Sequence, residues 1–191
     1  MKKLSNTYSR FTVNGTLSNK IFIFDIDNTL LNSDAKIHVV DDNGNIVKSL
    51  TSEEFNNYVL PDNFKFDFSE FSDLKMLLKS KLKPYFEILI REYFKGTHIS
   101  ILTARGNFQM IKKFFLQKGI DIKSNLIFAV GSSEYDKFGR VSERKSFCIK
   151  KLISYGYKYL TFFDDDINNL KDAERVCKQF NNITIKTVHV K

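Results

Sequence analysis

The stretch Ile21-Phe22-Ile23-Phe24-Asp25-Ile26-Asp27-Asn28-Thr29-Leu30 decides the fold. Its first four residues are β-branched or aromatic, which is typical of a strand buried on both faces of a sheet. Asp25 and Asp27 follow, and side chains two positions apart point the same way in an extended strand. Because adjacent acids repel each other, the pair indicates a bound divalent cation or shared protons in catalysis. The plain alternative is a strand followed by an Asp-Asn turn, which is common.

Three further segments place polar groups at the end of an apolar run or at the start of a helix. The run 98–102 leads into Thr103-Ala104-Arg105-Gly106, and the run 159–163 leads into Asp164-Asp165-Asp166-Ile167-Asn168-Asn169. Between them, Ser142-Glu143-Arg144-Lys145 opens a predicted helix with a lysine near its start. Ligands of open parallel α/β sheets bind beyond the carboxyl ends of the strands. The acids, the hydroxyl and the lysine are therefore predicted to converge on one crevice.

The order of these four motifs resembles the haloacid dehalogenase (HAD) superfamily of phosphotransferases. In sequence order they are DxDxT, an apolar run followed by threonine, a lysine, and an apolar run followed by an acid pair. The resemblance extends from about residue 20 to the last residue of the chain. It implies an α/β fold, with a Rossmann-like three-layer core built on a parallel sheet, and Mg²⁺-dependent phosphatase activity.

The resemblance also implies a role for each site residue. Asp25 would be the nucleophile that becomes an aspartyl-phosphate, and Asp27 would be the general acid and base. Thr103 would hydrogen-bond the phosphoryl oxygens, and Lys145 would neutralise the nucleophile and the phosphate. The Mg²⁺ ligands would be Asp25, the main-chain carbonyl of Asp27, and Asp165. The supporting residues would be Asp164, Asn169 and Arg105.

The chemistry of phosphate monoesters requires these residue types. The substrate is a dianion, so a carboxylate can approach it only after positive charge has compensated it. Mg²⁺ takes hard oxygen ligands, commonly one or two carboxylates with substrate phosphate and water, and a lysine adds a point charge. An acid that protonates the leaving oxygen and later deprotonates water needs a pKa near neutrality, which crowding by a second carboxylate supplies. Because dehalogenases and phosphonatases of the superfamily lack the second acid, Asp27 favours a phosphatase or phosphomutase.

Two assignments stay open at this stage. The acidic motif holds three consecutive aspartates, so Asp164, Asp165 and Asp166 all compete as the metal ligand. Asp165 is preferred because the second acidic position is the usual ligand in the superfamily. Lys137 and Lys150 compete with Lys145, which is preferred for its spacing to the acidic motif and its place at a helix start.

Length and composition favour a single domain over residues 1–191. Hydrophobic residues make up 42% and charged residues 27% of the chain, which are ordinary globular values. No run reaches the ~20 apolar residues of a membrane span, which excludes the ion-pump branch of the superfamily. Residues 1–20 lack the apolar region of a secretory signal and are expected to form a partly ordered arm. Cys148 and Cys177 fall at apolar positions of predicted helices, and the absence of a CxxC motif predicts a cytoplasmic location.

The rest of the pattern predicts repeated β-α units and hence a parallel sheet. One helix is expected to begin at Pro84 and end at Gly96, and another to span 108–118 and stop at Gly119. Further strands are expected over 126–130 and 183–190. They complete the sheet begun by the strands at 21–25, 98–102 and 159–163.

Residues 32–81 are predicted to form a flap or small cap inserted after the first strand. They contain a hairpin signal, 36–40 and 46–48 around an Asn-Gly turn, and a helix start at Thr51. Four phenylalanines follow, and we expect most of them to pack the flap onto the core: Phe64, Phe66, Phe68 and Phe71. So short an insertion predicts an open site, which suits a large substrate or a phosphate at the end of a polymer.

The net charge of +8 is compatible with a nucleotide or a nucleic-acid end as substrate. Lysines at 79–83 and 112–113 are candidates for backbone contacts, although lysine-rich faces are usually only solvated. The loop 131–140 offers candidate substrate contacts in Tyr135, Lys137, Phe138 and Arg140, with a plain surface loop as an equal alternative. Sugar phosphates or other small metabolites remain an alternative, as does an inactive HAD-like module that binds nucleic acid or a partner. No membrane association and no obligate protein partner are expected.

Overall fold

The centre of the molecule is a five-stranded parallel sheet in the order β10-β9-β3-β11-β12. The computed structural model describes residues 12–13, 16–17 and 19–191. The sheet strands are β3 (Lys20–Phe24), β9 (His98–Thr103), β10 (Ile127–Ala129), β11 (Tyr159–Asp164) and β12 (Thr184–His189). The predicted α/β fold with a parallel sheet is confirmed, and each of the five strands of this sheet lies within one residue of its expected bounds.

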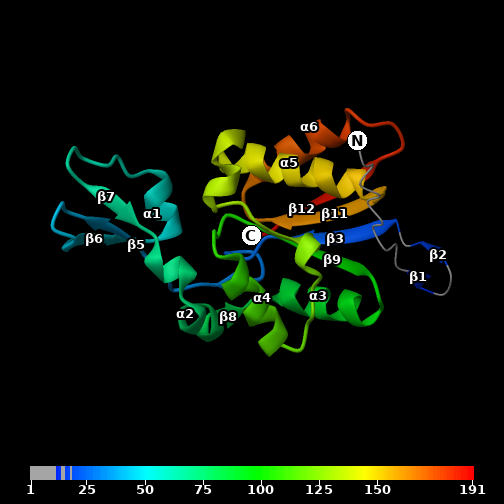
Figure 1. Ribbon diagram of the computed structural model, residues 1–191, viewed down its shortest axis with the longest axis horizontal. Helices are drawn as coiled ribbons and strands as arrows, with labels where there is room; N and C mark the ends of the chain where they lie inside the picture. The colour runs from blue at the N-terminus through cyan, green and yellow to red at the C-terminus, as the bar shows by residue number, and fades with distance from the viewer. Residues whose placement is uncertain (1–11, 14–15, 18) are drawn as a thin grey trace, which may run out of the picture.

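Two pairs of helices cover the faces of this sheet (Figure 1). One face carries α5 (Val141–Ser154) and α6 (Ile167–Cys177), and the other carries α3 (Pro84–Phe94) and α4 (Phe108–Gln117). The predicted helix ends are confirmed: Pro84 opens α3, and Gly96 and Gly119 have φ values of +79° and +77°. Within the described part of the chain, no helix is both long and apolar enough to cross a membrane.

Stacked phenylalanines tie the central strands to one another. The rings of Phe24 on β3 and Phe163 on β11 lie 4.6 Å apart and nearly parallel, immediately before the two acidic motifs. Cys148 and Cys177 are buried and free, as their apolar positions predicted. The core therefore fixes the strand ends from which the acids project.

The chain N-terminal to the sheet is described only in part. Strands β1 (Thr12–Val13) and β2 (Thr16–Leu17) pair antiparallel. The other residues of the arm expected over 1–20, apart from 19 and 20, lie outside the described residues.

The insertion leaves and returns through a two-stranded stem, β4 (Leu31–Asn32) against β8 (Lys81–Leu82). Beyond the stem lies an antiparallel sheet of β5 (Ile37–Val40), β6 (Ile46–Leu50) and β7 (Lys65–Asp67), in the order β6-β5-β7. The predicted hairpin and capping box are confirmed, since β5 pairs with β6 and Thr51 caps α1 (Ser52–Asn56) together with Glu54. The third strand was not predicted. The segments η1 (Ser69–Ser72) and α2 (Leu74–Lys79) lead back to the stem.

The aromatic residues of the insertion pack against one another rather than onto the main core. Ile37, Val39 and Leu50 form a separate hydrophobic cluster, joined by six partly buried residues: Phe55, Tyr58, Leu60, Phe64, Phe66 and Phe71. The expectation that these phenylalanines pack the flap onto the core is therefore wrong. The physical reason is β7, which pairs with β5 as a third strand. The insertion therefore has a sheet face of its own, against which these aromatic side chains pack.

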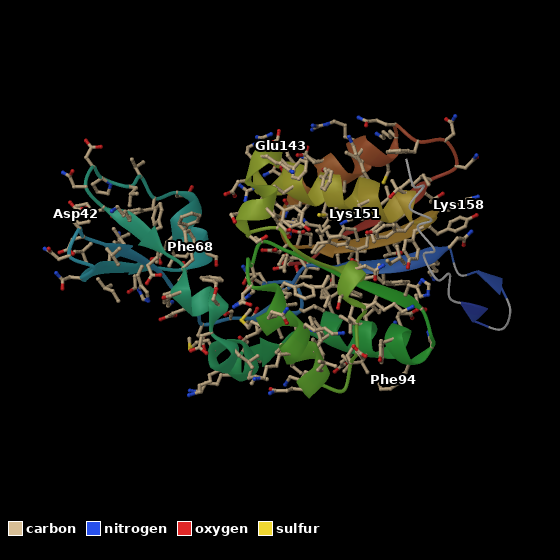
Figure 2. All side chains as sticks on the ribbon, in the orientation of Figure 1. Asp42, Phe68, Phe94, Glu143, Lys151 and Lys158 are labelled. Carbon is tan, nitrogen blue, oxygen red and sulfur yellow. The ribbon has the colours of Figure 1, made fainter. Side chains whose placement is uncertain are left out.

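The insertion stands beyond the edge of the main sheet where the strands reach their carboxyl ends (Figure 1). Phe68 lies on the side of the insertion toward the main domain and is 46% exposed (Figure 2). The edge predicted to hold the site is thus the edge next to the insertion.

Candidate active site

Polar residues from β3, β9, β11 and the first turns of α5 meet at this edge. The ammonium of Lys145 donates to Asp25 Oδ1 at 2.8 Å and to Asp164 Oδ2 at 2.7 Å. All three side chains are almost completely buried. The predicted convergence of the acids and the lysine on one place is therefore present in the structure. Lys137 and Lys150, the rival lysines, are exposed.

The chain leaves the strand at Asp25, so the two acids of the first motif do not lie side by side as in an extended strand. Residues 26–31 form a tight turn in which Leu30 and Leu31 donate to the carbonyl of Ile26. Asn28 has φ +56°, a left-handed conformation that asparagine tolerates better than most residues. As a result Asp25 faces Lys145, and the side chain of Asp27 faces a different cation.

That cation is Arg105, which the sequence suggested only as a supporting residue. Its Nε donates to Asp27 Oδ2 at 2.8 Å and its Nη2 donates to Asp27 Oδ1 at 2.7 Å. A two-pronged contact of this kind is the strongest geometry for a guanidinium and a carboxylate. The side chain of Arg105 is 1% exposed. Asp27 is therefore held by a buried cation. The spacing of the sequence motifs did not predict this pairing.

The three aspartates after β11 occupy different environments. Asp164 is fully buried and accepts from Lys145, from Asn169 Nδ2 at 2.9 Å and from the amide of Asp166 at 2.9 Å. Asp166 caps α6 by accepting from the amide of Asn168 at 2.8 Å. Asp165 is partly exposed and is not engaged by either buried cation. Asp164 is therefore fully engaged by protein groups, whereas Asp165, which is hydrogen-bonded with Asn28, and Asp166, which lines a surface cavity, are both at least partly open to solvent.

Electrostatics in the cluster favour an additional positive charge. Burial raises the pKa of Asp25, and the neighbouring carboxylates of Asp164, Asp165 and Asp27 raise it further, against the lowering effect of Lys145. Burial alone would lower the pKa of Lys145, but the charges of Asp164 and Asp25 outweigh burial and raise it. We therefore take Lys145 as charged. The four acids Asp25, Asp27, Asp164 and Asp165 thus outnumber the two buried cations, Lys145 and Arg105.

The donor set fits Mg²⁺ with two carboxylate side chains. Among the described residues, no group of three or more His, Cys, Asp or Glu is placed to hold a metal ion. Lys145 occupies one oxygen of Asp25, and Arg105 occupies both oxygens of Asp27. The second oxygen of Asp25, the carboxylate of Asp165 and the carbonyl of Asp27 remain, and Mg²⁺ sites commonly use one or two carboxylates. The buried Oδ1 of Asn169 also has no hydrogen-bond partner within the described structure.

Thr103 and Gly131 lie beside the loop that carries Arg105. Gly131 was not among the predicted site residues. Thr103 is fully buried at the end of β9, and its Oγ1 accepts from the amide of Arg105 at 3.2 Å. Gly131 lies against this loop so closely that a Cβ there would sit 2.0 Å from the carbonyl oxygen of Ala104. Only glycine permits this approach. A glycine directly after the strand at 126–130 was the available signal.

One residue of the loop 131–140, Tyr135, does not fit its expected role as a substrate contact. Most of the loop forms η3 (Ser133–Phe138), in which Tyr135 is buried in the main core and burial raises the pKa of its hydroxyl. Tyr135 is thus not available for the predicted substrate contact. Phe138 stacks on Phe147 at 3.9 Å between ring centroids, with Lys137 over its ring. Arg140 is exposed beside the start of α5 and lines a surface cavity of about 380 Å³ with Asp166 and Arg175.

The two lysine runs also differ in their surroundings. Lys112 is engaged by Asp121 and by the carbonyl of Ile122, away from the acidic cluster. Lys83 donates to the carbonyl of Asn28 at 2.6 Å and so lies beside the turn that follows Asp27. Of the two lysine runs, 79–83 is therefore the one with a lysine beside this turn.

Asp165→Asn should stabilise the metal-free protein at neutral pH. Burial and the charge of Asp164 raise the pKa of Asp165. A raised folded-state pKa gives stability that is present below the unfolded pKa of about 3.9 and is lost as the pH rises through the folded value. We expect the melting temperature in EDTA at pH 7 to rise by roughly 2–4 °C, equivalent to about 1 kcal/mol, and the gain to shrink toward pH 4. A gain that is equal at both pH values would contradict the electrostatic explanation.

Comparison of the chain with models of protein families, with curated proteins and with solved structures finds no match in any of the three.

Proposed function

We propose that this chain is a Mg²⁺-dependent phosphomonoester hydrolase of the HAD type that acts through an aspartyl-phosphate at Asp25. The observation that supports the proposal most strongly is the placement of Lys145 between Asp25 and Asp164 at the carboxyl edge of the parallel sheet. A buried lysine with two buried acids is costly for stability alone, because both charge types lose hydration. Such a cluster with uncompensated negative charge is common where a site performs chemistry.

The proposed reaction consists of two displacements at phosphorus. In the first, a carboxylate oxygen of Asp25 forms a bond to phosphorus, the ester P–O bond breaks, and Asp27 gives its proton to the leaving oxygen. In the second, water attacks the acyl-phosphate, Asp27 takes a proton from it, and Asp25 is released with inorganic phosphate. Lys145 would balance the charge of Asp25, and Thr103 would donate to a phosphoryl oxygen.

Asp25, Asp165 and the carbonyl of Asp27 would hold the metal ion. Bound there, Mg²⁺ would supply positive charge that lets an anionic ester approach an anionic nucleophile. The four acids of the cluster outnumber its two buried cations, so a bound cation would reduce the repulsion among the carboxylates.

Turnover of p-nitrophenyl phosphate should require Mg²⁺ and should stop in EDTA. Asp165→Ala should reduce the rate in Mg²⁺ by about 10²-fold or more, because it removes one of the two carboxylate side chains available to the ion. Asp62→Asn, at an exposed position of the insertion, should leave the rate unchanged. Full activity in EDTA would refute the metal assignment, and no activity under any condition would favour an inactive binding module.

For the substrate we propose a phosphate on a nucleotide or on a nucleic-acid end. The support is the net charge of +8, Lys83 beside the turn after Asp27, and exposed Lys137 and Arg140 in the segment that leads into α5, the helix of Lys145. Tyr135 has no part in this proposal because it is buried. Free sugar phosphates are the rival class.

Oligonucleotide turnover should fall more steeply with salt than turnover of p-nitrophenyl phosphate, because lysine contacts to phosphates release counterions. Lys137→Glu combined with Arg140→Glu should raise KM for the oligonucleotide by about tenfold and leave the small ester nearly unchanged. Lys158→Glu is the matched control, since Lys158 lies at the opposite end of the sheet (Figure 2). Equal salt dependence of turnover for both substrates, or a preference for a hexose phosphate, would show that Lys137 and Arg140 are solvated surface residues that do not bind the substrate.

A further inference from the structure

The insertion and the main domain have separate hydrophobic interiors. The main cluster includes the residues of the sheet and its helices, whereas Ile37, Val39 and Leu50 form the centre of the second cluster. Phe71, at the end of the insertion that leads back to the stem, belongs to the second cluster. An element with its own interior can shift as a unit, so the contacts that hold it against the site decide where it rests.

One buried guanidinium joins the two parts at the site. Besides its two bonds to Asp27, Arg105 donates through Nη1 to the carbonyl of Phe71 at 2.7 Å and through Nη2 to Ser33 Oγ at 3.3 Å. Its carbon Cζ lies 5.0 Å from the centre of the Phe71 ring. Ser33 lies where the chain enters the insertion and Phe71 where it returns. Arg105 therefore contacts both ends of the insertion and the proposed general acid at once.

This bridge constrains the chemistry proposed for Asp27. Both of its carboxylate oxygens accept from Arg105, so a proton exchanged with a leaving oxygen or with water must use the lone pairs that Arg105 leaves free, and the position of Arg105 sets their direction. A buried arginine that loses part of its pairing needs its remaining partners, and these belong to the insertion. The position of Asp27 and the seating of the insertion are thus linked through one side chain.

We propose that Arg105 is a positioning residue that couples the seating of the insertion to the orientation of Asp27. The proposal rests on the proposed function for its catalytic consequence, but the mechanical coupling does not. Because coupling is reciprocal, weakening the Asp27 end should loosen the insertion, and weakening the insertion end should impair proton transfer by Asp27.

The first experiment measures the coupling without any activity. Amide hydrogen exchange of residues 69–72 should become at least about threefold faster in Asp27→Asn, which keeps the shape of the side chain but removes its charge. Asp165→Asn is the matched control, since it makes the same change in the same cluster at an acid that Arg105 does not bind, and exchange at 69–72 should stay unchanged. Unchanged exchange in Asp27→Asn would overturn the proposal.

The second experiment uses leaving groups that differ in their need for a proton. Phe71→Leu removes the ring beside Arg105, and Arg105→Lys removes the two-pronged contact with Asp27. Both should reduce kcat for an alkyl phosphate at least about tenfold more than kcat for p-nitrophenyl phosphate, whose leaving group needs little protonation. Phe64→Leu, in the same hydrophobic cluster, is the control for loss of packing.

The outcomes separate the two proposals. Equal losses on both substrates in Phe71→Leu and Arg105→Lys would show a merely structural role and overturn the coupling. Wild-type protein that hydrolyses no phosphate ester would refute the proposed function, and the exchange experiment would then decide the coupling by itself.

Discussion

Asp25→Asn should abolish hydrolysis of every phosphate ester and leave the fold intact. The substitution keeps the shape of a side chain that is almost completely buried, but it removes the attacking carboxylate. We expect kcat to fall by about 10³-fold or more, measured with p-nitrophenyl phosphate in excess Mg²⁺. The circular dichroism spectrum and the cooperativity of unfolding should match those of the wild type.

The controls distinguish the nucleophile from the other acids of the cluster. Asp62→Asn should behave as the wild type. Asp27→Asn should be severely impaired on alkyl phosphates but still accept a phosphoryl group from an ester with a good leaving group. Wild-type turnover by Asp25→Asn would exclude Asp25 as the nucleophile, whatever the behaviour of the other variants.

Lys145→Met should destroy both activity and much of the stability of the metal-free protein. The Lys145 side chain is 2% exposed, and its ammonium lies within hydrogen-bond distance of two carboxylates whose side chains are also almost completely buried. Removing one partner of a buried ion pair costs about 3–5 kcal/mol, because the remaining charge is left unpaired. Urea unfolding in EDTA should show a loss of this size.

A double variant tests the cause of that loss. Adding Asp164→Asn to Lys145→Met removes one of the two unpaired charges and should recover part of the stability, without restoring activity. Lys150→Met, on the exposed face of the same helix, should change neither quantity appreciably. If the double variant is less stable than Lys145→Met alone, unpaired charge is not the source of the loss.

The main sheet could be predicted from the sequence because each strand is a short apolar run that ends in polar or turn residues. The residues 21–24 are the clearest case, and the ends of α3 and α4 were equally readable from Pro84, Gly96 and Gly119. Local chemistry alone fixes such features. The meeting of Asp25, Lys145 and Asp164 also followed from a general rule, since parallel strands bring their carboxyl ends to one edge.

Features that depend on tertiary packing could not be predicted in this way. The pairing of Arg105 with Asp27 joins residues far apart in the chain, and it arises because the turn at Asn28 points Asp27 away from Asp25. Tyr135 was expected in a surface loop but is buried, because η3 folds back onto α5. The phenylalanines of the insertion pack against one another, because the pairing of β7 with β5 gives the insertion a three-stranded sheet of its own.

The most direct test of the central claim is to trap the phosphorylated enzyme. Protein quenched in acid during turnover of p-nitrophenyl phosphate with Mg²⁺ should gain the mass of one phosphoryl group. Treatment with borohydride should then reduce the acyl-phosphate, and peptide sequencing by mass spectrometry should find homoserine in place of Asp25. The Asp25→Asn variant should show neither change. An active enzyme that never gains the phosphoryl mass, or that carries it on a residue other than Asp25, would contradict the account.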